Sequence, residues 1–236
     1  MLIQGRQIDG VIFDIDGTLV DSFATLVEVF NQGIRQFSLA PVSLAFLNDG
    51  MKRNLTLGEI LQKVFPPETE GFVIERCRDQ ILEHYLRIEE TEVKPFPAVP
   101  ELFRNLKARG LRVGVATGRT SAPEREWVRF KRYGLDPYID SIVTSKEVEH
   151  RKPAPDALIE CARRLGIAIE NCLVVGDTES DIVAARRAGA ISVAVTTGLE
   201  SRALLEQEKP EFLFESLDDF KRILDEKDPD NNVAAA

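Results

Sequence analysis

Short apolar runs alternate along this chain with longer stretches in which apolar residues recur about every three to four positions, the spacing of an amphipathic helix. Strands that alternate with helices in this way indicate a parallel sheet covered by helices on both faces. The predicted fold class is therefore α/β. The predicted strands are Val11–Phe13, Leu111–Ala116, Ile139–Val143, Cys172–Val175, Ile191–Val195 and Phe212–Phe214.

Three helices between these strands carry signals at their ends. Two of them, Glu101–Ala108 and Asp156–Leu165, follow a proline. These two and the third helix, Ser180–Ala188, all end close to a glycine. Proline is favoured at the start of a helix and glycine just past its end. These signals support the alternation of strand and helix.

One stretch breaks the alternation. From about residue 22 to residue 90, apolar residues keep helical spacing and no convincing strand occurs. We expect a helical insertion of roughly 70 residues, which is within the size of a small domain. The expected division is an α/β domain formed by residues 1–20 and 92–236, with a helical domain at residues 21–91.

Composition narrows the classes of protein. The formal net charge of −9 argues against general binding of nucleic acids, which favours a basic surface. Cys77, Cys161 and Cys172 lack metal-site spacing and are expected to be buried thiols of a reducing compartment. No apolar run reaches membrane-spanning length, and Met1–Gly10 lacks a signal-peptide pattern, so we expect a cytoplasmic protein.

Two aspartates follow the first predicted strand. In an extended chain, Asp14 and Asp16 would project to the same side. Two like charges that close repel each other unless a cation or a shared proton compensates. This pair is therefore the first indication of a site.

Polar residues also follow the other predicted strands. Thr117-Gly118-Arg119, Arg151-Lys152 and the segment from Gly176-Asp177 to Asp181 occupy such positions. Ligands of open α/β sheets bind at the carboxyl ends of the strands. Carboxylates, a hydroxyl and a lysine at this edge suit Mg²⁺ together with a phosphate group.

These residues resemble the four motifs of the haloacid dehalogenase superfamily of phosphotransferases. The motifs match at Asp14-Ile15-Asp16-Gly17-Thr18, at Thr117, at Lys152, and at Gly176-Asp177 with Asp181. The similarity covers nearly the whole chain and is closest to the phosphoglycolate phosphatase and β-phosphoglucomutase branch. It implies a Rossmann-like parallel sheet core with helices on both faces plus an inserted α-helical cap domain.

The resemblance also implies roles in the reaction. Asp14 would attack phosphorus and form an aspartyl phosphate, while Asp16 would serve as the acid and base. Thr117, the Gly118 amide and Lys152 would hold the phosphate oxygens as charge spreads over them.

The metal ligands follow from the same resemblance. Mg²⁺ would be held by Asp14, the backbone carbonyl of Asp16, and Asp177. Asp181 would support the metal site and Lys152 without binding the metal itself. Thr178-x-x-Asp181 also has the spacing of a helix capping box, and the two roles of Asp181 are compatible.

Two further basic features have competing interpretations. Lys52 and Arg53 follow Gly50 in the helical insertion, where they either meet a second anionic group of the substrate or form an exposed turn. Arg119, Arg125 and Arg129 recur at helical spacing and are expected to form a solvated face, although Arg119 is near enough to the site to touch substrate.

Four functions remain in competition. The first is a phosphatase for a small phosphorylated metabolite, with phosphoglycolate as the leading substrate. The second is a phosphosugar mutase, favoured by Gly50-x-x-Arg53 but opposed by Leu26, which stands where the mutases carry histidine. The third is a true dehalogenase, which would lack Asp16. The fourth is a catalytically silent, metal-dependent binding protein, which would not need a nucleophile, an acid/base, a cation and a metal ligand together. Monomer and homodimer are equally open.

Overall fold

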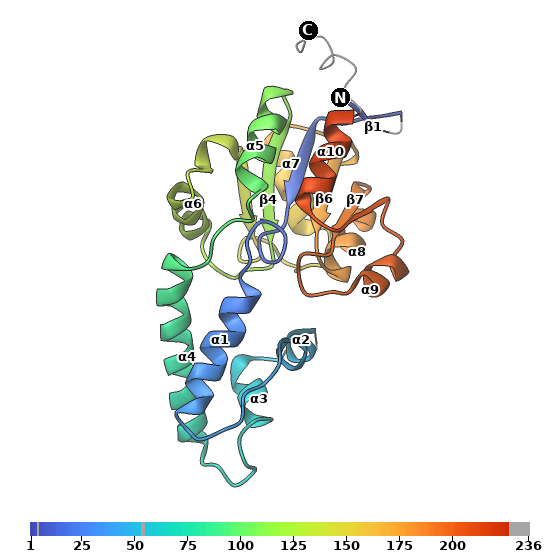
Figure 1. Ribbon diagram of the computed structural model, residues 1–236. Helices are drawn as coiled ribbons and strands as arrows, with labels where there is room; N and C mark the ends of the chain where they lie inside the picture. Colours follow the sequence, from blue (N-terminus) through green and yellow to red (C-terminus); the bar gives the residue numbers. More distant parts are fainter. Residues whose placement is uncertain (4, 53–54, 227–236) are drawn as a thin grey trace. The chain divides into compact units, whose positions relative to one another are not determined.

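The protein is described here by a computed structural model that covers residues 1–3, 5–52 and 55–226. The chain divides into two compact units, one formed by residues 1–20 and 95–236 and the other by residues 21–94. The elements of both units are drawn in Figure 1. Among the described helices, none has the length and apolar composition needed to cross a bilayer.

The first unit is built on a six-stranded parallel sheet, which confirms the α/β prediction. Its strands lie in the order β5-β4-β3-β6-β7-β8. Every predicted strand is present, with small shifts at the ends, and a short antiparallel hairpin of β1 (Leu2–Ile3) and β2 (Arg6–Gln7) precedes them. The sheet strands are β3 (Gly10–Phe13), β4 (Arg112–Thr117), β5 (Ser141–Thr144), β6 (Cys172–Gly176), β7 (Ile191–Val195) and β8 (Phe212–Phe214).

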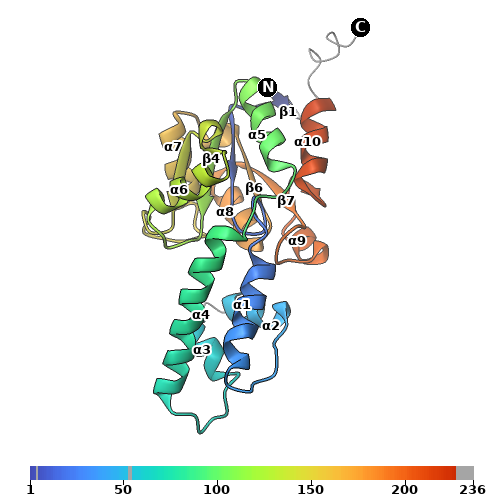
Figure 2. The ribbon, with the colours of Figure 1, turned by 60° about the vertical axis from the view of Figure 1, so that its left-hand side comes forward.

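Helices cover both faces of this sheet, as Figures 1 and 2 show. Helices α5 and α10 lie on one face, and α7 and α8 lie on the other. The helices of this unit are α5 (Val99–Ala108), α6 (Pro123–Arg132), α7 (Asp156–Leu165), α8 (Glu179–Ala188), α9 (Arg202–Gln207) and α10 (Leu217–Glu226), with short 3₁₀ turns at Asp136–Tyr138 and Ile169–Asn171.

Strand β3 is the centre of the core. Its residues are buried, and neighbouring side chains point to opposite faces of the sheet. Ile12 packs in the cluster that includes residues of α7 and α8. Phe13 lies against Phe103 of α5, with ring centroids 5.3 Å apart, and against Phe220 of α10 at 6.5 Å. Burial on both faces fixes the end of this strand, which is where the site begins.

The second unit is entirely helical in its described part. It contains α1 (Phe23–Arg35), α2 (Leu44–Lys52), α3 (Leu57–Gln62) and α4 (Gly71–Thr91). A separate apolar cluster that includes Phe30, Ile34, Leu61 and Ile81 holds these helices together. This core belongs to the unit itself.

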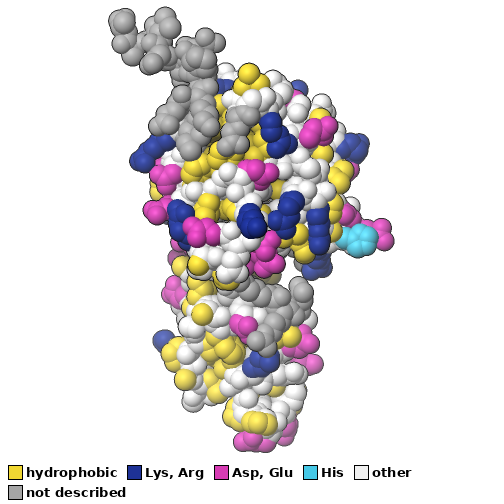
Figure 3. Space-filling view, turned by 90° about the vertical axis from the view of Figure 1, so that its right-hand side faces the viewer, with side chains coloured by type: hydrophobic (Ala, Val, Ile, Leu, Met, Phe, Trp, Pro, Cys, Tyr) yellow, Lys and Arg dark blue, Asp and Glu magenta, His cyan; other side chains and the backbone are white. Residues whose placement is uncertain are grey.

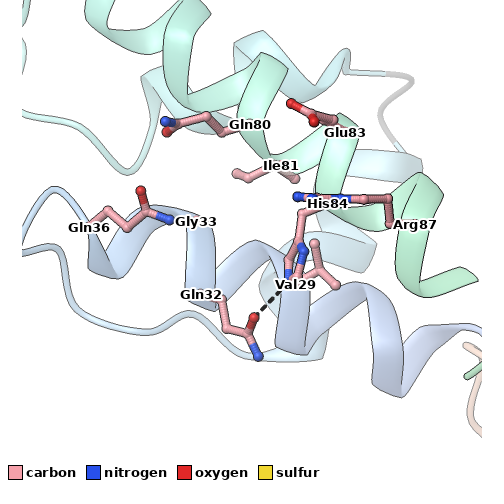
Figure 4. Close-up of a pocket in the computed structure, with 9 residues that line it drawn as sticks. All are labelled: Val29, Gln32, Gly33, Gln36, Gln80, Ile81, Glu83, His84 and Arg87. Atoms are coloured by element: carbon pink, nitrogen blue, oxygen red, sulfur yellow. Dashed lines mark hydrogen bonds between the residues drawn. The ribbon is translucent and has the colours of Figure 1, made fainter.

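A cavity of about 440 Å³ lies between α1 and α4 within this unit (Figure 4). Gly33 and Ile81 line it, and a hydrogen bond of 2.8 Å joins His84 Nε2 to Gln32 Oε1 across the two helices. His84 therefore helps to pack α4 against α1.

The surface carries charge of both signs. On the face in Figure 3, acidic and basic side chains lie among one another, with hydrophobic side chains between them. The three cysteines are free thiols and all are buried, which confirms the interpretation of them as small core residues.

Helix α6 corrects one expectation about the arginines. Glu126 and Arg129 are both buried, and Arg129 Nε donates to Glu126 Oε2 at 2.8 Å. Ser121 Oγ also donates to Glu126, at 2.6 Å. The prediction of a solvated arginine face is therefore wrong for Arg129, because an acidic residue three positions earlier neutralises it inside the fold.

Gly33→Ala should destabilise the helical unit, although alanine normally favours a helix. A Cβ at Gly33 would lie 2.3 Å from Ile81 Cγ1, and such overpacking costs about 1–3 kcal/mol. At Gly58 of α3 the nearest atom is 3.9 Å away, so Gly58→Ala should gain up to about 1 kcal/mol from helix propensity. Urea unfolding followed by circular dichroism measures both, and a Gly33→Ala protein as stable as Gly58→Ala would contradict the packing described here.

Candidate functional site

The register of the central strands brings the motif residues to one edge. Phe13 is aligned with Val115 of β4 and with Val175 of β6. The next residue, Asp14, continues this pairing, because its amide donates to the Val175 carbonyl at 2.9 Å. Thr117 ends β4 and Asp177 directly follows β6. The three residues therefore lie at the carboxyl ends of adjacent parallel strands.

The ammonium of Lys152 joins two of the carboxylates. Its Nζ donates to Asp14 Oδ1 at 2.9 Å, to Asp181 Oδ1 at 2.7 Å and to the Ala116 carbonyl at 2.7 Å. An ammonium has three N–H donors, so these contacts use all of them. The side chains are 7 % exposed for Lys152, 12 % for Asp14 and 4 % for Asp181. The motif residue Lys152 is thus the internal cation of the site.

Burial changes the acid–base properties of these groups. It raises the pKa of Asp14 to about 7, an effect that the Lys152 ammonium opposes and the charges of Asp181 and Asp16 increase. Burial also raises the pKa of Asp177, and the charges of Asp181 and Asp14 raise it further. For Lys152, burial acts to lower the pKa, but the two carboxylates outweigh it and the pKa is raised. The lysine therefore stays charged beside carboxylates that repel one another.

Asp177 is held by two segments distant in the sequence. Thr18 Oγ1 donates to its Oδ1 at 2.9 Å, and the Leu199 amide donates to its Oδ2 at 3.0 Å. Gly198 lies so close that a Cβ there would be 1.8 Å from Oδ2. Thr197 Oγ1 donates to the Gly17 carbonyl at 2.6 Å, which connects this loop to the turn after β3. The loop after β7 therefore orients the Asp177 carboxylate.

Asp181 has two roles at once. It forms a capping box at the start of α8, in which Thr178 N and Oγ1 both donate to Asp181 Oδ2, at 3.2 and 2.6 Å. Its other oxygen accepts from Lys152. Gly176 permits the close approach, because a Cβ there would lie 2.3 Å from the Asp181 Cβ. The helix cap and the support of Lys152 coexist, as the sequence allowed.

The carboxylates fit a divalent cation. Ligand oxygens of Asp14, Asp177 and Asp181 all lie within 4.8 Å of one another. Three carboxyl groups face one ammonium, so they would carry excess negative charge if all were ionised, and the raised pKa values of Asp14 and Asp177 follow in part from this repulsion. Hard oxygen donors in this number suit Mg²⁺ better than softer metals.

Asp16 lies in a turn beyond the strand. Strand β3 ends at Phe13, the chain bends at Ile15, and Gly17 takes a positive φ of 77°. Asp14 and Asp16 therefore do not lie in one extended strand, the condition under which the sequence predicts their side chains on the same side. The Asp16 carboxylate instead pairs with Arg119, whose Nε and Nη2 donate to it at 2.6 and 2.5 Å. The expected solvated face is wrong for Arg119 as well.

The segment after β4 is tied to its neighbours through the backbone. Thr117 is buried, and its Oγ1 accepts from the Arg119 amide at 3.2 Å. The Gly118 carbonyl accepts from Ser145 Oγ at 2.8 Å. Thr117 and Gly118 thus stand beside Ala116, whose carbonyl is bound by Lys152.

The basic segment of the helical insertion is outside this description. Lys52 is the last residue of α2, but its side chain and the whole of Arg53 lie outside the described residues.

Several contacts were not anticipated from the sequence. Thr18 stands inside the first motif but had no predicted role, and no pattern in the sequence pointed to Ser145. Thr197 and Gly198 could have been found, because they follow the predicted strand Ile191–Val195 just as the motif residues follow the other strands.

Comparisons with known proteins agree with this fold and site. The family model described as haloacid dehalogenase-like hydrolase matches residues 11–195. A pyrophosphatase PpaX of Bacillus cereus is 37% identical over 132 residues, which cover 56% of this chain and 60% of that protein. The chain thus aligns with less than two thirds of the curated relative.

Solved structures share the fold. A protein of Haemophilus somnus described as a predicted phosphoglycolate phosphatase has a TM-score of 0.77 at 22% identity, over 92% of this chain and 98% of that one. A hydrolase of Pseudomonas syringae has a TM-score of 0.69 at 26% identity, with the same coverage. With a family model that spans most of its length and the site geometry above, this chain belongs to the haloacid dehalogenase-like hydrolases.

Proposed function

We propose that this protein is a Mg²⁺-dependent phosphatase that acts on a small phosphorylated metabolite through an aspartyl phosphate, with phosphoglycolate as the leading substrate. The observation that carries the proposal is the Lys152 ammonium held between Asp14 and Asp181, beside Asp177. This arrangement combines a nucleophile, a fixed cation and oxygen ligands at one edge of the sheet.

Asp14 is the proposed nucleophile. Attack by its carboxylate on phosphorus forms an O–P bond and breaks the bond to the leaving oxygen. Lys152 already contacts Asp14 Oδ1, so its charge is in place to orient the nucleophile and to offset negative charge on the phosphate. Thr117 and the Gly118 amide are proposed to hold other phosphate oxygens.

Asp16 is the proposed acid and base. It would give a proton to the leaving oxygen and then take one from the water that hydrolyses the aspartyl phosphate. Asp14, Asp177 and the Asp16 carbonyl would hold Mg²⁺, which supplies positive charge between two anionic reactants. Asp181, which accepts from Lys152, is proposed to orient this lysine.

A phosphosugar mutase is the second candidate. The sequence Gly50-x-x-Arg53 favours it, but Leu26 packs against the apolar cluster of the helical unit at the position where the mutases carry histidine. The chain therefore lacks an imidazole at that position, which supports the phosphatase over the mutase.

Asp14→Asn should abolish turnover while the protein stays folded. The amide is a poor nucleophile of nearly the same shape, so phosphate release should fall by roughly 10³-fold or more, as for loss of a covalent nucleophile.

The wild-type protein should release phosphate from phosphoglycolate, hexose phosphates, nucleotides or pyrophosphate only when Mg²⁺ is present. Pyrophosphate belongs in the panel because the Bacillus cereus relative is a pyrophosphatase.

Circular dichroism of Asp14→Asn provides the control for folding. Undiminished phosphate release by this variant would refute the mechanism. Rapid conversion of β-glucose 1-phosphate to the 6-phosphate with little free phosphate would favour the mutase instead.

Gly198→Ala should weaken Mg²⁺ binding. The new Cβ would displace the Asp177 carboxylate, and loss of a residue that orients a metal ligand typically costs about 10- to 100-fold in affinity. Isothermal titration with Mg²⁺ measures the effect directly. Gly71→Ala is the matched control, because nothing lies within 4 Å of a Cβ at that position. Equal Mg²⁺ affinity in Gly198→Ala and the wild-type protein would show that this loop does not orient the ligand.

A further inference from the structure

The ion pair between Arg119 and Asp16 engages the side chain that the proposed reaction needs as its acid and base. Nε and Nη2 of Arg119 donate to different oxygens of Asp16, at 2.6 and 2.5 Å. To pass a proton to a leaving oxygen, one Asp16 oxygen has to carry that proton and face the substrate. The two-point contact engages both oxygens. The contact takes one lone pair on each oxygen and turns both oxygens toward Arg119, so Asp16 can face the substrate more freely once Arg119 has turned at least partly away.

This pair is more open to exchange than the other ion pairs of the site. The side chains of Arg119 and Asp16 are 16 % and 25 % exposed, whereas those of Lys152 and Asp181 are 7 % and 4 % exposed. An incoming anion from solvent can therefore compete for the guanidinium. The ammonium of Lys152 already uses its three donors on protein oxygens.

The backbone under Arg119 is fixed, so the long side chain is the part that moves. The Ser145 amide donates to the Arg119 carbonyl at 3.0 Å, and the Ser145 hydroxyl shares its one hydrogen between the carbonyls of Gly118 and Arg119, at 2.8 and 3.0 Å. The Arg119 amide is also held, by Thr117 Oγ1. Rotation of the side chain changes the partner of the guanidinium without disturbing the strand end.

The charges at this edge define what such a partner would be. Within the described part of the chain, the site brings two cations, Lys152 and Arg119, together with four carboxyl groups, those of Asp14, Asp16, Asp177 and Asp181. A substrate with a second anionic group would meet the charge of Asp16 at the leaving side of the phosphate. Arg119 is the cation in contact with Asp16, and a planar guanidinium binds a carboxylate or a phosphate equally well through two parallel N–H donors.

We propose that Arg119 selects substrates whose leaving group carries a second anionic group, and that it exchanges Asp16 for that group on binding. The inference rests on the proposed function and narrows its substrate class to phosphorylated carboxylates and diphosphates. With a neutral leaving group, Arg119 keeps Asp16 engaged and turnover is slow. With an anionic one, binding of the substrate releases Asp16.

The test compares two substrates that differ in one charge: phosphoglycolate and glycolamide phosphate, in which a carboxamide replaces the carboxylate. Arg119→Gln should raise the KM for phosphoglycolate by roughly 10- to 100-fold, the loss expected for a charge-assisted contact. The KM for glycolamide phosphate should change little, and its kcat should stay equal or rise because Asp16 is no longer held. Pyrophosphate is the third arm, which distinguishes a phosphate from a carboxylate as the second anion.

Arg132→Gln is the control, because Arg132 is exposed and its described contact is with the Tyr133 ring. Equal losses of kcat on all three substrates in Arg119→Gln would overturn the inference, because they would mean that Arg119 only positions Asp16. No turnover of any substrate by the wild-type protein would overturn the proposed function itself.

A binding measurement covers the case in which Arg119→Gln does not fold. Asp14→Asn, which keeps Arg119, should bind phosphoglycolate at least roughly 10-fold more tightly than glycolamide phosphate in isothermal titration, and added salt should reduce the difference. Equal affinities for the two ligands would overturn the inference.

Discussion

The Lys152 ammonium between Asp14 and Asp181 is the interaction on which the rest of the site depends. It brings an acidic residue at the end of β3 together with one at the start of α8, and a third contact joins it to the end of β4. Removing one partner of such a buried group leaves an uncompensated charge, which is far more costly than loss of a surface ion pair. The lysine therefore keeps three parts of the sheet edge in register.

The same edge holds more carboxyl groups than this lysine can neutralise if all are ionised. The packing maintains this arrangement: Gly176 and Gly198 have no side chains where Asp181 and Asp177 approach, and Thr18 and the Leu199 amide bind Asp177. A fold that brings carboxylates this close pays in stability unless a cation joins them. This crowding of carboxyl groups is the physical reason for proposing a divalent metal at this place.

The sequence predicted the sheet well because β3 and its neighbours are buried on both faces and are read as continuous apolar runs. The residues after those strands were found for the same reason. Arg119 was misread because helical spacing says nothing about a partner, and the partner, Asp16, is distant in sequence. The place of Gly198 after a predicted strand marks its segment, but its close contact with Asp177 depends on the fold and is not visible in the sequence.

The carboxyl groups at this edge lie so close together that they need a cation to be ionised at the same time. Isothermal titration of Mg²⁺ in buffers of different ionisation enthalpy tests this by counting the protons released on binding. Asp14 has a pKa raised to about 7 in the metal-free protein, so it is partly protonated near neutral pH and must lose that proton to bind the metal. We expect proton release near pH 7 that increases toward pH 6 and decreases as the pH rises above the raised pKa values of Asp14 and Asp177. Mg²⁺ binding without proton release at pH 6 to 7, or no binding at all, would contradict the account.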